Sequence, residues 1–169
     1  MTPASIDLSF ELLQEQHAAK LFEPFQAEDI YRFIPERPPA SLEDAQRQFK
    51  QFSAGPEEGS DEFWYNWVIR DANSGTHFGT LQATVFSDGL LWIGYKLASI
   101  YWNMGIATRS VEWLVVELKN RHPGLPIHAS VDTRNHASIR VLEKVGFVQL
   151  RTEDAEIHGV ASEDFIYHI

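Results

Sequence analysis

The fold of this chain is decided by the stretch from Leu91 to Phe147, which contains L-W-I-G-Y-K-L (91–97), A-S-I-Y-W-N-M-G-I-A-T (98–108) and N-H-A-S-I-R-V-L-E-K-V-G-F (135–147). The first segment is short and apolar, which predicts a strand. A loop around Gly105 follows, and beyond it apolar residues recur at helical spacing: Ala107, Val111, Leu114, Val115 and Leu118. We therefore expect a strand, a loop and a helix in this order.

A loop that opens a helix can bind an anion. The first N–H groups of a helix have no partner inside it, and they carry the positive end of the helix dipole. A diphosphate can therefore bind to the backbone N–H groups around Gly105. The strand, the loop and the helix together predict an anion site.

Three segments of this stretch resemble a known family. They are I-G-Y at 93–95, the loop W-N-M-G-I-A at 102–107, and one segment that runs from N-H-A-S at 135–138 to L-E-K-V-G-F at 142–147. In order and spacing they resemble the GNAT superfamily of N-acetyltransferases, whose motifs are Q/R-x-x-G-x-G/A and N-x-x-S-x-x-V-L-E-K-x-G-F. The resemblance is closest to the Rim-type branch, whose members acetylate the N-terminal amine of ribosomal proteins.

The resemblance implies acetyl-CoA as cosubstrate and assigns its contacts. The pantetheine is expected beside Leu97, and the pyrophosphate is expected in the loop formed by Trp102, Asn103, Met104, Gly105, Ile106 and Ala107. Trp102 departs from the Gln or Arg of the family. Asn135 matches the Asn whose amide can bond the pantetheine, although a helix N-cap is an alternative role for this residue.

The group that assists the leaving thiolate is Ser138 by the same resemblance. Many GNAT enzymes place a Tyr seven residues after the motif Asn, but this chain has Leu142 there. In Rim-type members the role has been given to a Ser three residues after the Asn. A hydroxyl is a poor acid at neutral pH, so we expect Ser138 to hydrogen-bond the developing thiolate. Its alternative role is that of an ordinary residue in the first turn of a helix.

The position of the general base departs from the family pattern, because Rim-type sequences often carry Glu directly before I-G-Y and this chain has Trp92. Trp92 cannot titrate. The alternatives are His128, Asp132, Glu62 or a water molecule. Among them His128 is the best candidate, because it lies on the strand that faces the cleft and an unperturbed His has a pKa near 6.5. A structural role for His128 is also open.

Two classes of function remain open at this point. The first is transfer of acetyl from acetyl-CoA to a primary amine, on a peptide N-terminus or a small molecule, by direct attack in a ternary complex. A neutral amine is already a competent nucleophile and needs only proximity, deprotonation and a stabilised oxyanion. The alternative is an acyl-CoA binder or sensor without efficient turnover, which Trp92 and Trp102 favour.

Composition limits the other possibilities. With 169 residues, 44% hydrophobic and 22% charged, we expect one domain over residues 1–169. No Cys is present and the His spacing matches no metal motif, so we expect no metal. The net charge of −10 argues against a nucleic-acid partner and favours a cationic one, although such a charge also serves solubility.

The expected location of the protein depends on two features that its sequence lacks, a membrane helix and a signal peptide. No apolar run approaches the roughly 20 residues of a membrane helix, so no membrane partner is expected. The segment M-T-P-A-S at 1–5 lacks the features of a signal peptide, which favours the cytoplasm. The expected assembly is a monomer or homodimer.

The periodicity along the chain predicts an α/β (α+β) fold. Turn signals at 72–75 and 87–89 separate three apolar runs, which indicates an antiparallel meander. The expected strands are 6–12, 63–70, 78–86, 90–97, 125–131, 147–151 and 165–169, and the expected helices are 14–25, 42–52, one opening near 105, and 135–145. This order, β-α-α-β-β-β-α-β-α-β-β, is that of the GNAT fold.

The GNAT fold implies a central mixed, mostly antiparallel sheet of about seven strands. The family splays the fourth strand from the fifth, which exposes backbone groups to which the pantetheine can bond. We expect the acceptor pocket to be built by residues 14–55 and 152–164, which carry no recognisable motif.

Overall fold

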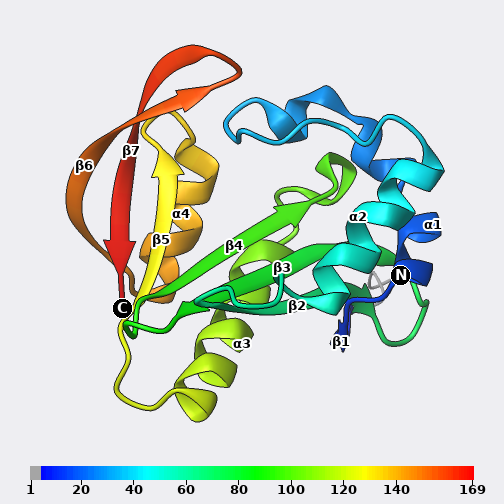
Figure 1. Cartoon of the computed structure of the whole chain (residues 1–169). Coiled ribbons are helices and arrows are strands. Elements are labelled where there is room, and N and C mark those ends of the chain that lie inside the picture. The colour runs from blue at the N-terminus through cyan, green and yellow to red at the C-terminus, as the bar shows by residue number, and fades with distance from the viewer. Residues whose placement is uncertain (1–4) are drawn as a thin grey trace.

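The computed structural model describes residues 5–169 and contains one seven-stranded sheet in the order β1-β2-β3-β4-β5-β7-β6 (Figure 1). The strands are β1 (Leu8–Leu12), β2 (Glu62–Asp71), β3 (His77–Phe86), β4 (Leu91–Leu97), β5 (Ile127–Asp132), β6 (Val148–Ile157) and β7 (Val160–His168). The helices are α1 (Ala18–Leu21), α2 (Leu42–Ala54), α3 (Ile106–Arg121) and α4 (His136–Val145). The predicted fold class and element order are confirmed.

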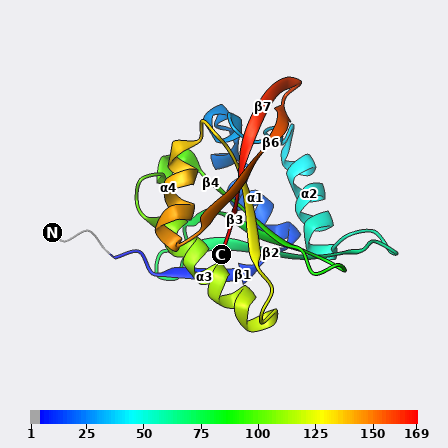
Figure 2. The same cartoon turned by 90° about the vertical axis from the view of Figure 1, so that its left-hand side faces the viewer.

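Helices cover both faces of the sheet, with α3 and α4 on one face and α1 and α2 on the other (Figure 2). The core on the α3 side contains the buried helix residues Val111, Leu114 and Leu118 together with Trp67 and Ile69 of β2. A second core lies under α1 and α2. The alternation of β2 side chains between the two faces explains why both cores draw on this strand.

The pairing between β4 and β5 breaks off after three residue pairs. These strands form the one parallel pair of the described sheet, and it joins 91–93 to 127–129. Beyond it β4 continues on β3 as far as Leu97, and β5 continues on β7 as far as Asp132. Residues 94–97 and 130–132 therefore have one strand edge each without a ladder partner, and we call this break the opening. The splay predicted between the fourth and fifth strands is confirmed (Figure 1).

Two helix ends carry residue types that are typical of such positions. The Ser41 hydroxyl accepts the N–H of Asp44 at 3.1 Å and caps α2. Helix α4 ends at Gly146, whose φ of 107° lies in the region that favours glycine.

Two parts of the chain differ from the prediction. Residues 14–25 do not form one helix but the short 3₁₀ turn η1 (Glu15–His17), the single turn α1 and part of η2 (Pro24–Gln26), followed by η3 (Glu28–Tyr31). Proline at the start of η2 prevents a continuous helix. Strands β6 and β7 are longer than expected and pair with one irregularity, between Gln149 and Arg151, so most of 152–164 is a hairpin that turns at His158 and Gly159.

Two further expectations can be set against the described residues. Within 5–169 no helix is both long and apolar enough to cross a membrane. The same residues bring together no group of three or more His, Asp or Glu side chains that could hold a metal ion. Most of the segment in which we expect no signal peptide, residues 1–4, lies outside the described part of the chain.

The packing of α3 gives a test of this core. Leu114 is fully buried, so Leu114→Ala should lower the free energy of unfolding by about 2–5 kcal/mol, through lost burial and the cavity left behind. Val116 on the same helix is 60% exposed, and Val116→Ala should change the free energy of unfolding by less than about 0.5 kcal/mol. Urea denaturation measures both. Equal losses in the two variants would mean that α3 packs through another face.

Candidate functional site

The loop between β4 and α3 has a backbone shape suited to an anion. Asn103 and Gly105 both have positive φ angles, of 62° and 75°. Gly105 caps the 16-residue helix α3, and a Cβ placed on it would meet no atom within 4 Å. Glycine is therefore favoured here by backbone conformation and not by crowding inside the protein.

Successive N–H groups of this loop lack backbone partners. The first hydrogen bond at this end of α3 runs from Arg109 N to Gly105 O, at 3.2 Å. Among residues 5–169, the N–H groups of 103–108 donate to no backbone or side-chain acceptor. A row of free amides at the N-terminus of a long helix is a site for phosphate oxygens. The loop therefore fits a pyrophosphate group.

Trp102, where the family has Gln or Arg, ties the loop to the strand before it. Its indole Nε1 donates to the carbonyl of Leu97 at 3.0 Å, at the end of β4 in the opening. Ile106 anchors the other side of the loop, because its side chain is fully buried in the core. Met104 between them is half exposed. No local sequence pattern indicates the contact from Trp102 to Leu97, because an indole can bond to any nearby carbonyl.

Ser138 pairs with a tyrosine that sequence reasoning did not consider for the site. Tyr95, in the opening on β4, places its Oη 2.5 Å from the Oγ of Ser138, in the first turn of α4. Burial raises the pKa of Tyr95 to about 12, so this phenol is protonated at neutral pH. The contact bridges the two sides of the opening between residues 43 positions apart.

Asn135 has the capping role that was the alternative in the sequence. Its Oδ1 accepts the N–H of Ser138 at 3.2 Å, at the start of α4. Its Nδ2 donates to no acceptor among the described residues. The amide can therefore cap the helix and still donate a hydrogen bond to a ligand.

His128 lies at the end of the opening where β4 and β5 are still paired, which we call the closed end. It is the register partner of Trp92 in the parallel ladder, and the centroids of the two rings lie 5.2 Å apart. Its Nδ1 is 3.3 Å from the carbonyl oxygen of Leu91, which can only accept. The tautomer that satisfies this contact carries its proton on Nδ1. In neutral His128, Nε2 is then left as a proton acceptor.

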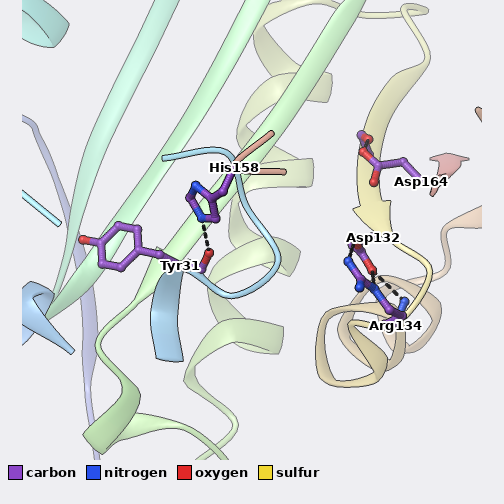
Figure 3. Close-up of polar contacts among 6 residues, drawn as sticks. Tyr31, Asp132, Arg134, His158 and Asp164 are labelled. Carbon is purple, nitrogen blue, oxygen red and sulfur yellow. Dashed lines mark hydrogen bonds and ion pairs between the residues drawn. The ribbon is translucent and has the colours of Figure 1, made fainter. Parts of the chain in front are cut away.

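The other two candidate bases are placed less favourably. Asp132 is buried and forms a bidentate ion pair with Arg134, with Nε to Oδ1 at 2.9 Å and Nη2 to Oδ2 at 2.8 Å (Figure 3). These hydrogen bonds lower the pKa of Asp132, which makes it a weaker base. Glu62 begins β2, two strands away from β4, and accepts the indole N–H of Trp64 at 2.6 Å.

The segment 22–40 crosses over the wide end of the opening on the α1 and α2 face. Its Glu36 pairs with Lys96 of β4 at 2.6 Å. The carbonyl of Tyr31 lies 3.1 Å from Nε2 of His158, at the tip of the β6–β7 hairpin (Figure 3). The segment thus joins β4 to the hairpin.

Comparison with known proteins agrees with this geometry. Residues 7–148 match the acetyltransferase (GNAT) domain family. No match is found among the curated proteins.

Solved structures share the fold at low sequence identity. The RimL ribosomal L7/L12 alpha-N-protein acetyltransferase in complex with coenzyme A is 18% identical with a TM-score of 0.83, over 99% of this chain and 96% of that chain. The ribosomal-protein-S5-alanine acetyltransferase from Vibrio fischeri is 22% identical with a TM-score of 0.78, over 96% and 92%. An acetyltransferase (GNAT family) from Bacillus anthracis is 17% identical with a TM-score of 0.80, over 96% and 94%.

The family match covers most of the chain and includes the opening, the amide-lined loop and the start of α4. The chain therefore belongs to the GNAT acetyltransferase family, and its acetyl donor is acetyl-CoA.

Proposed function

We propose that this protein transfers acetyl from acetyl-CoA to a primary amine by direct attack in a ternary complex. The observation that carries the proposal is the opening between β4 and β5, which lies beside a row of free amides at the start of α3. Acetyl-CoA supplies an activated acyl group, so the protein has to hold the donor, expose its carbonyl and accept a proton from the amine.

The donor is held by backbone in this proposal. The N–H groups of 103–107 bind the pyrophosphate at the positive end of α3. The edge of β4 at 94–97, which has no ladder partner toward β5, bonds the pantetheine as a neighbouring strand would, except at the Leu97 carbonyl, which already accepts the indole N–H of Trp102. Asn135 adds its Nδ2 from the opposite side while its Oδ1 caps α4. This arrangement points the thioester toward the closed end of the opening.

Ser138 stabilises the leaving thiolate with help from Tyr95. Either hydroxyl can be the donor in the contact between Tyr95 and Ser138. In the proposed mechanism the phenol of Tyr95 donates to the Oγ of Ser138, which leaves the Ser138 proton free to bond the sulfur. As the amine nitrogen bonds to the carbonyl carbon, the carbon–sulfur bond breaks and the sulfur gains negative charge. A hydrogen bond that strengthens at this moment lowers the barrier more than it strengthens binding of the donor.

His128 is the proposed base. Its Nε2, left as an acceptor by the contact from Nδ1 to Leu91, takes the proton that the amine loses. This residue stands beside Trp92, the position at which Rim-type sequences often carry Glu. Asp132 is excluded from the role by its ion pair with Arg134, which holds its pKa down.

Two observations support an amine as the acceptor. Two of the similar structures are enzymes that by name acetylate ribosomal protein L7/L12 or the alanine of ribosomal protein S5. The net charge of −10 also favours an amine or a basic peptide segment over an anionic acceptor. The acceptor is therefore an amine on a peptide N-terminus or on a small molecule.

A second candidate is coenzyme binding without turnover, favoured by the non-titrating Trp92. A thiol-release assay over a panel of amines and peptides separates the two functions. Release with any acceptor supports transfer, whereas tight coenzyme A binding with release on none supports the binder.

The coenzyme site is tested by two glycine variants at opposite ends of α3. Gly105→Glu places a negative charge at the proposed pyrophosphate site and should weaken coenzyme A binding at least about tenfold, as measured by calorimetry. Gly124→Glu is the matched control, because Gly124 also has positive φ, of 84°, and open space around its Cβ. The control carries the same backbone strain and should bind coenzyme A normally. Equal binding by both variants would contradict the assignment of the loop.

The Tyr95–Ser138 pair is tested by a double-mutant cycle. Ser138→Ala should lower kcat about 10–100-fold with little change in the KM for acetyl-CoA, because the lost contact matters mainly in the transition state. Tyr95→Phe should lower kcat through the same bond, so the double variant should be little worse than Ser138→Ala alone. Steady-state rates with a saturating amine measure both effects. Additive losses, or a wild-type rate for Ser138→Ala, would remove the pair from the mechanism.

A further inference from the structure

A cavity of about 440 Å³ lies on the α2 face of the sheet. Four aromatic side chains from four elements line it: Phe52 of α2, Trp64 of β2, Phe86 of β3 and Trp92 of β4. Glu62 is the one ionisable residue in this lining, as far as the described residues go. Within the described residues Glu62 forms no ion pair, and its carboxylate accepts the indole N–H of Trp64.

The cavity adjoins the closed end of the opening. Its wall residue Trp92 is the register partner of His128 and lies against that ring. Its wall residue Gln82 covers Gly94, the first residue of β4 beyond the parallel pairing, so closely that a Cβ on Gly94 would lie 3.4 Å from the Cγ of Gln82. An acceptor whose amine reaches His128 can therefore extend into this cavity.

The charge around the cavity is negative at its far end. A second hollow continues past Glu62 and Trp64 and is lined by Glu57 and Glu58 as well. Neither lining includes a Lys or Arg of the described chain. Aromatic faces and carboxylates both attract an organic cation, and a partly desolvated Trp ring does so most strongly. The chemistry of the walls fits an ammonium or guanidinium group.

We propose that this cavity binds a second, cationic group of the acceptor, separate from the amine that is acetylated. The inference rests on the proposed acetyl transfer and names the class of acceptor. Glu62 and His128 lie three strands and two residues apart in the sheet register, about 16 Å between Cα atoms by ordinary sheet dimensions. Both side chains span part of this distance, so the acceptor is an extended molecule whose second cation lies on the order of 10 Å from the reacting nitrogen.

Three small acceptors with the same eight-carbon chain test the second charge. Octylamine, amino-octanol and octamethylenediamine share the reacting amine and differ at the far end, which is apolar, hydroxylated or cationic. After correction for its two equivalent amines, the diamine should have a kcat/KM at least about tenfold above either monoamine, mainly through KM, because it forms a charge-assisted contact with Glu62. Equal values for the three acceptors would overturn the proposal and leave acetyl transfer standing.

Two variants that each remove one carboxylate test whether Glu62 causes the preference for the diamine. Glu62→Gln should abolish the preference for the diamine. Glu112→Gln removes the same charge from an exposed position of α3, on the other face of the sheet, and should retain the preference. Peptides that differ only by Lys or Gln at their third position decide whether the cation can also be carried by a peptide. A preference that survives Glu62→Gln would contradict the assignment to this cavity.

A binding measurement separates this inference from the proposed function. Trp64 and Trp92 line the cavity, so the diamine should change the tryptophan fluorescence of the protein without coenzyme, and Glu62→Gln should weaken that binding about tenfold or more. If no acceptor is acetylated but this binding is seen, the cavity assignment stands and transfer fails. Diamine binding that is equal in wild type and Glu62→Gln would overturn the cavity assignment alone.

Discussion

The break in hydrogen bonding between β4 and β5 is the constraint on which the rest of the structure depends. Backbone groups that leave a ladder need other partners, so an unpaired edge in the middle of a sheet is costly unless something fills it. Both strands remain fixed on their outer edges by β3 and β7, which holds the opening apart. The segment 22–40 and the Tyr95–Ser138 contact bridge it on the two faces of the sheet. The protein thus keeps free a strand edge that a linear ligand can occupy.

The closed end of this opening carries the unusual chemistry of the chain. Trp92 and His128 lie side by side there, where a carboxylate often lies in Rim-type sequences. An indole cannot take a proton, but it forms a wall for the cavity on the α2 face and packs against the imidazole. The same substitution therefore moves the proposed base to β5 and gives the acceptor side an aromatic surface. Asp132, the nearby carboxylate on β5, is neutralised by Arg134.

Local signals predicted most of the fold, and long-range contacts explain what they missed. Turn residues at 72–75 and 87–89, the cap at Ser41 and the glycine at Gly105 each act within a few residues, so the meander and α2 to α4 could be located from sequence. The 3₁₀ turns of 15–31 are too short for a periodic pattern, and the exposed charges of β6 hide its alternation. The pairs Tyr95–Ser138 and Tyr31–His158 join residues 43 and 127 positions apart, which no local pattern encodes.

The central claim is that the opening and the adjacent loop hold acetyl-CoA along their backbone. Hydrogen–deuterium exchange with and without coenzyme A tests it most directly, because it reads the amides themselves. Coenzyme A at about 100 times its dissociation constant should slow exchange about tenfold or more at 94–97 and 103–107 together. The loop from α3 to β5, around Gly124, should exchange at an unchanged rate. Coenzyme binding that leaves both segments unprotected would contradict the account.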